Sequence, residues 1–179
     1  MATTFQMTID HFPEILEKNA SGLMQRIISK TKMSINADLQ LSNATACNFF
    51  LQTSAEALVR QFESQLKDAL QDIRARQSSG KTGGFGSGLS LDTEGSEEQL
   101  AIADMKSTAL FAQLCAKGKQ HQINGVDAYD AKLFMNAMRE AFNKSKFPDG
   151  ELTSIFPHAI RALDSELINL YSKLDLLAV

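Results

Sequence analysis

Apolar residues recur at spacings of three and four along most of the chain, which is the period of an amphipathic α-helix. In the N-terminal part this spacing predicts one helix over about residues 11–31 and a second, uninterrupted helix from Asn43 to about Arg76. Apolar positions alternate between Met33 and Leu41, so a short strand is the alternative for that stretch, although an isolated strand is unstable.

A glycine- and serine-rich segment follows these two helices. Six of the ten glycines lie between Gly80 and Gly95. Glycine loses more backbone entropy on ordering than any other residue, so we expect residues 77–95 to form a flexible linker. The linker divides the chain into an N-terminal helical pair, residues 1–76, and a C-terminal three-helix unit, residues 96–179.

Helix-start signals divide the C-terminal part. Ser96-Glu97-Glu98-Gln99 has the pattern of a capping box and opens a predicted helix that ends near Gly118. Asp127 is the expected N-cap of a fourth helix, and Phe147-Pro148-Asp149-Gly150 has the composition of a turn. The sequence therefore predicts an all-α protein of about five helices, in two antiparallel, bundle-like halves.

The last predicted helix, residues 151–177, carries the most regular apolar stripe, with Pro157 in its first turns. Its apolar positions step by four and three, which is heptad spacing: Phe156, Ile160, Leu163, Leu167, Leu170, Leu174 and Leu177. The stripe is interpreted as one wall of an intramolecular bundle, or as a docking or dimerisation seam that Tyr171 widens. The candidate interaction residues are Leu163, Leu167, Leu170, Tyr171, Leu174 and Leu177.

Charge and composition exclude several classes of partner. The 179 residues carry a net charge of −3, and basic residues alternate with acidic ones, as between Glu56 and Asp72, which is typical of a solvated helix face. We therefore predict no nucleic-acid partner. No signal peptide or membrane-spanning run is present, so we expect a cytoplasmic protein with free thiols at Cys47 and Cys115, although residues 2–6 could hide a secretion signal.

No motif for catalysis, cofactor binding or metal binding is recognised. Gly80-Lys81-Thr82 resembles the end of a phosphate-binding loop, but Ala75 stands where that loop needs its first glycine. The histidines His11, His121 and His158 lie in different segments, and none has a second ligand at metal-binding spacing. We predict no catalytic, cofactor-binding or metal-binding residues and no cofactor.

Three segments carry a resemblance to a known family: Leu89-Ser90-Leu91 with residues 97–105, Leu133 to Phe142, and Glu166-Leu167-Ile168-Asn169-Leu170-Tyr171. Over residues 89–177 the chain resembles the bacterial domain-of-unknown-function family sixteen thirty-one, whose members sometimes carry a thymidine phosphorylase label. Asn124 to Tyr129 replaces the proline-containing loop expected there. The resemblance implies a bacterial helical protein and supplies no catalytic residues.

These observations favour a non-enzymatic interaction module, an adaptor or regulator whose partner is another protein or a second copy of the chain. The heptad stripe, the glycine-rich linker and the lack of a recognisable site motivate this hypothesis. Two alternatives remain open. One is a component, chaperone or effector of a bacterial secretion system, and the other is an enzyme whose site forms only in the tertiary structure.

Overall fold

The computed structural model describes residues 4–79 and 101–178, and this part of the chain is helical with no strand. Its elements are α1 (Thr4–Ala37), α2 (Ala44–Thr53), α3 (Ala55–Ser79), α5 (Lys106–Gln120), the 3-10 helix η2 (Val126–Tyr129), α6 (Ala131–Lys144) and α7 (Asp149–Leu177). The all-α prediction is confirmed. The described residues hold more helices than the five expected, because two of the predicted helices are interrupted.

The first helix is longer than its predicted span in both directions. It starts at Thr4, because Phe5 and Ile9 continue its buried face, and it extends to Ala37, into the first part of the stretch from Met33 to Leu41 for which a strand was the alternative. The strand is therefore wrong: Ile35 is fully buried on α1, whereas Met33 is 70% exposed and Leu39 is 94% exposed in the following turn. The alternating apolar residues between Met33 and Leu41 therefore belong to the end of a helix and the turn after it, and not to a strand.

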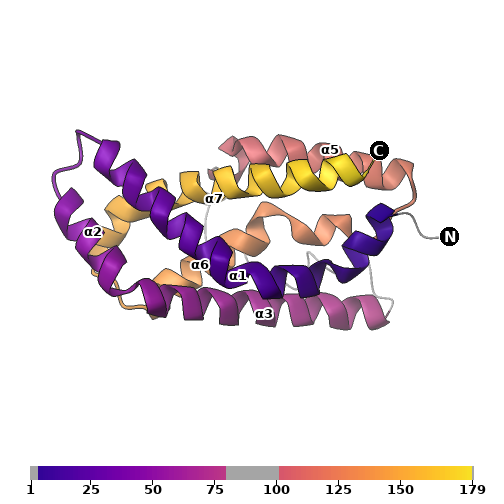
Figure 1. The fold of residues 1–179 in the computed structure, drawn as a ribbon, viewed down its shortest axis with the longest axis horizontal. Helices are drawn as coiled ribbons and strands as arrows, with labels where there is room; N and C mark the ends of the chain where they lie inside the picture. Colours follow the sequence, from indigo (N-terminus) through magenta and orange to yellow (C-terminus); the bar gives the residue numbers. More distant parts are fainter. Residues whose placement is uncertain (1–3, 80–100, 179) are drawn as a thin grey trace.

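The predicted second helix bends at Ser54. Its hydrogen bonds continue across the bend, from Ser54 N to Phe50 O at 3.0 Å and from Leu58 N to Ser54 O at 2.8 Å. Ser54 itself leaves the helical conformation, with φ −100° and ψ 5°, so α2 and α3 take different directions (Figure 1). After the bend, α3 remains helical to Ser79, three residues into the predicted linker.

The predicted third helix is interrupted at Met105, whose backbone is extended. The carboxylate of Asp164 on α7 caps the new helix start, because it accepts from Ser107 N at 2.8 Å and from Lys106 N at 3.1 Å. Helix α5 then passes through Gly118 and ends at Gln120. This cap comes from a residue 57 positions away in the sequence.

The N-cap of α6 also differs from the prediction. Asp127 lies inside η2, and Asp130 caps α6 instead, its carboxylate accepting from Leu133 N at 3.2 Å. Both aspartates lie a few residues before the same apolar face, so spacing alone does not separate them. Pro157 lies deeper in α7 than predicted, because that helix begins at Asp149.

Helix α1 contacts both α3 and α7, while α6 packs against α3 and α5 packs against α7 (Figure 1). The buried residues form one hydrophobic core to which residues before and after the predicted linker both contribute. The N-terminal helical pair and the C-terminal helices therefore pack on each other. No described helix has the length and apolar character needed to cross a bilayer.

Candidate functional site

The leucine stripe of α7 lies mostly in the core. Leu163, Leu167, Tyr171 and Leu174 are buried, and Leu170 is half-buried. Leu177, at the end of the helix, is 40% exposed. The bundle-wall interpretation therefore describes four of the six candidate residues, while a docking role for Leu177 stays a prediction.

Tyr171 is a structural residue of this core. Its hydroxyl donates to the carbonyl oxygen of Tyr129 at 2.7 Å, and its ring lies 5.1 Å from that of Phe111. Burial raises the pKa of Tyr171 well above its ordinary value, and the nearby charge of Asp130 raises it further. The phenol therefore stays neutral and links α7 to η2.

A row of polar residues on α1 faces the two buried polar residues of α7. Arg26, Lys30 and Ser34 follow one another every fourth position on one face of α1, and Asp38 continues the row one residue after the helix ends. The first pair contacts Glu166 and the second pair contacts His158. The residue numbers rise along α1 as they fall along α7, so the two helices are antiparallel.

Glu166 is ionised at the α1–α7 interface, which we call the α1–α7 seam, although its side chain is only 4% exposed. Arg26 Nε lies 2.6 Å from Glu166 Oε1, and Lys30 Nζ pairs with Oε2. Burial opposes the charge of the Glu166 carboxyl, but the hydrogen bonds and charges of Lys30 and Arg26 outweigh burial and lower its pKa.

His158 connects Ser34 and Asp38, the residue types of a hydrolytic triad. Its Nδ1 lies 2.6 Å from Ser34 Oγ, and its Nε2 lies 3.2 Å from Asp38 Oδ2. A neutral imidazole satisfies both contacts when Nε2–H donates to Asp38 and Nδ1 accepts from the Ser34 hydroxyl. However, Ser34 lies within α1, whose backbone N–H groups are engaged in the helix and are not free to stabilise an oxyanion. The arrangement therefore fastens the end of α1 to α7.

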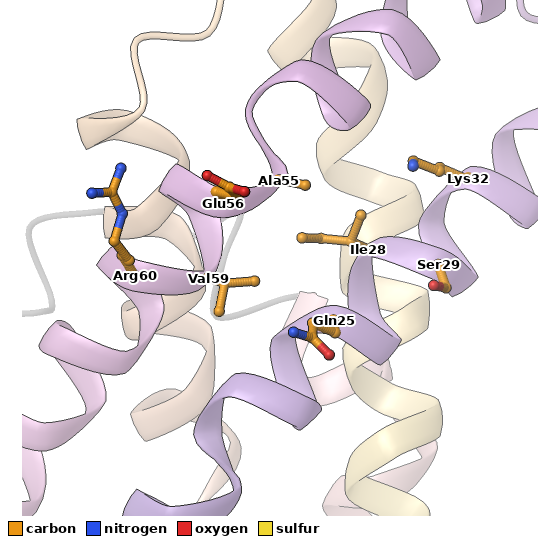
Figure 2. Close-up of a pocket in the computed structure, with 8 residues that line it drawn as sticks. All are labelled: Gln25, Ile28, Ser29, Lys32, Ala55, Glu56, Val59 and Arg60. Carbon is orange, nitrogen blue, oxygen red and sulfur yellow. The ribbon is translucent and has the colours of Figure 1, made fainter.

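A surface groove between α1 and α3 is the candidate binding site, with a volume of about 490 Å³. Its lining residues are Gln25, Ile28, Ser29 and Lys32 of α1 and Ala55, Glu56, Val59 and Arg60 of α3. Ile28 and Val59 point toward each other across the groove, and Lys32 extends from α1 toward the side of Ala55 (Figure 2). The volume lies within the range of ligand pockets, and the groove combines an apolar floor with polar walls.

The cations of the groove differ from the paired cations elsewhere on the same two helices. Glu166 pairs with Arg26 and Lys30, and Glu17 pairs with Lys67 and Arg74. In contrast, no ion pair or hydrogen bond from Lys32 or Arg60 is present in the described part of the chain. Because Glu56 is the one anionic residue among the lining residues, the groove walls carry a net positive charge.

Exposed apolar side chains lie beside this groove. Met33, Leu39 and Phe49, which we call the apolar corner, are 70%, 94% and 61% exposed. Met33 lies one turn after Ser29 on α1, and Phe49 lies two turns before Glu56 along the bent helix. Asn48 Nδ2 donates to Asn36 Oδ1 at 2.5 Å and so joins the end of α1, which carries Met33, to α2, which carries Phe49.

The remaining sequence candidates add no chemistry to this site. Burial raises the pKa of the Cys47 and Cys115 thiols, as do nearby carboxylates, so both favour the unreactive protonated form. The capping box at Ser96 to Gln99, Gly80-Lys81-Thr82 and the rest of the predicted linker from Gly80 onward lie outside the described residues.

Sequence reasoning missed the groove because its residues resemble ordinary solvated helix positions. Glu56 and Arg60 belong to the alternating charges that indicated a solvated face, and Gln25, Ser29 and Lys32 carry no motif. The tertiary packing of α1 on α3 brings them together. No protein-family model matches the chain, and neither do any curated protein or solved structure.

Proposed function

We propose that this protein is a non-enzymatic protein–protein interaction module, an adaptor or regulator that binds another protein through apolar side chains on its helices. The observation that carries this proposal is the exposure of Met33, Leu39 and Phe49, which lie near the end of α1, in the turn after it and on α2, two helices joined there by the Asn48–Asn36 hydrogen bond. Single exposed apolar residues are common on protein surfaces, whereas apolar residues gathered into one patch with a polar rim favour an interaction site.

The corner is a better contact surface than the buried part of the leucine stripe. Leu163, Leu167, Tyr171 and Leu174 fill the space beneath neighbouring helices, so a partner could reach them only if the bundle opened. Met33, Leu39 and Phe49 are available without any rearrangement. Covering them releases water from apolar surface, which favours association by about 25 cal/mol per Å² before its entropic costs.

Affinity capture with the full-length chain tests the proposal. The immobilised protein is incubated with an extract of its source cells, bound proteins are quantified by mass spectrometry, and self-association is measured by light scattering. The triple variant Met33→Ser, Leu39→Ser, Phe49→Ser should lose the partner, or the self-association, that the unaltered chain shows. Circular dichroism should be unchanged, because the three side chains are exposed.

A matched control removes exposed apolar residues elsewhere. The variant Met7→Ser, Ile15→Ser, Leu176→Ser loses side chains of 54%, 41% and 76% exposure that lie outside the corner, and it should retain binding. Equal binding by both triple variants, or the absence of any partner and of self-association, would refute the proposal.

A further inference from the structure

We infer that the groove between α1 and α3 is the specificity site of this interaction surface and that it binds an acidic amphipathic helix of a partner protein. The inference rests on the proposed function and adds the chemistry of the partner. Two observations carry it: the walls have a net positive charge from cations without ion pairs among the described residues, and the floor is apolar, with exposed Met33 directly after the lining residue Lys32 on α1.

The floor selects for an apolar side chain. Ile28 is buried and Val59 is half-buried, and both belong to the hydrophobic core or pack against it. Ala55, at the start of α3 after the bend at Ser54, leaves space at one end of the floor because its side chain is small. An apolar residue of a partner helix that enters this space is removed from water on several sides.

The walls select for carboxylates near that apolar residue. Lys32 stands on the α1 wall and Arg60 on the α3 wall, so cations flank the floor on both sides. Neither is neutralised by a neighbouring helix, unlike Arg26, Lys30, Lys67 and Arg74. A partner helix with acidic residues beside its apolar stripe would supply the missing countercharges, and complementary charges favour the correct partner over others.

The length of the surface favours a helix over a small molecule. From Gln25 to Met33, which directly follows the lining residue Lys32, the surface follows α1 for about 12 Å at 1.5 Å per residue. A helix of two to three turns matches this length. Its apolar positions at spacings of three, four and seven can contact the floor and the corner together.

Selection from a phage-displayed library of random 16-residue peptides against the full-length protein tests the inference. Binders are counter-selected on the variant Ser29→Trp, which places a large side chain on the groove wall. Ser29 is exposed, so this change removes no core contact. Selected peptides should carry apolar residues at spacings of three and four together with Asp or Glu.

The affinity of labelled peptides, measured by fluorescence anisotropy, gives the decisive comparison. The variant Lys32→Glu, Arg60→Glu should bind the selected peptides about tenfold more weakly, because two favourable ion pairs become repulsive. The variant Lys18→Glu, Lys173→Glu changes the net charge equally at exposed positions outside the groove, and it should bind within about twofold of the original chain.

Enriched peptides without carboxylates, no enrichment over Ser29→Trp, or equal affinity for both charge variants would overturn the inference. Its failure is separable from that of the proposed function. If the corner variant loses its partner while the groove variants bind normally, the interaction module stands and the acidic-helix specificity is wrong. If the groove variants lose binding and the corner variant does not, the groove acts without the corner.

Discussion

Replacing the buried carboxylate of the α1–α7 seam is the most direct test of the packing described above. In the variant Glu166→Gln the side chain keeps its length and one oxygen acceptor, but it loses the charge that Arg26 and Lys30 bind. The two cations then face each other across a neutral amide. We expect the free energy of unfolding to fall without a change of fold.

The exposure of the two cations sets the size of the loss. Removing one partner of a fully buried ion pair costs about 3–5 kcal/mol, because the remaining charge stays in the interior. Here the Arg26 side chain is 57% exposed and that of Lys30 is 35% exposed, so both can regain water. We therefore expect a loss of about 1–2 kcal/mol, the cost of weakened charge-assisted hydrogen bonds.

The effect should depend on pH in a defined direction. The folded-state pKa of Glu166 is lowered from its ordinary value of 4.5, so the unfolded chain takes up its proton first as the pH falls. The stabilisation is therefore complete above about pH 5 and is lost as the pH falls through the folded-state pKa. The difference between the original chain and Glu166→Gln should shrink over that acidic range.

Urea unfolding followed by circular dichroism measures the difference, which should appear as a shift in midpoint of about 0.5–1 M at pH 7. The surface pair of Lys117 with Asp175 provides the control, since both side chains are 35% exposed and Asp175→Asn should cost less than about 1 kcal/mol. Equal losses for both variants, or a Glu166→Gln effect that does not change between pH 7 and pH 3, would refute the reasoning.

Two further predictions test individual contacts. Asp130→Ala should lower the free energy of unfolding by about 1 kcal/mol, because Leu133 N loses its cap. Asp127→Ala should change it by less than about 0.5 kcal/mol. Thermal unfolding compares the two variants, and a larger effect at Asp127 would contradict the assignment of Asp130 as the N-cap. Tyr171→Phe should cost about 1–2 kcal/mol in urea unfolding because the buried carbonyl of Tyr129 loses its donor, and an unchanged midpoint would show that this hydrogen bond contributes nothing.

Local periodicity was sufficient to predict that the chain is helical and where its principal buried faces lie. The spacing of three and four places Leu58, Phe62 and Leu66 on one face of α3, and the structure buries all three. Helix interruptions were not predictable in this way, because Ser54 and Met105 do not break the apolar pattern that surrounds them. The start of α5 depends on Asp164, a residue of another helix.

The polar contacts between α1 and α7 and the groove between α1 and α3 also could not be predicted from local spacing, because both form only when separate helices pack together. His158 contacts Ser34 and Asp38 across more than a hundred residues of sequence, and no spacing rule connects them. One signal was present in the sequence: Arg26, Lys30, Ser34 and Asp38 form a polar row at four-residue spacing beside the apolar face of α1. Such a row is also typical of a solvated helix face. Only the packing of α7 against α1 shows that these polar residues make contacts between the two helices.

The position of α1 has a consequence for how the protein is made. More than a hundred residues separate the end of α1 from the start of α7. At about 5–20 residues per second, the ribosome needs roughly 5 to 20 s to synthesise the residues between the two helices. During that time α3 can already cover one side of α1, but the side that awaits α7 has no partner. The polar row keeps part of that side compatible with water, which limits wrong associations of the nascent chain until Glu166 and His158 have been synthesised.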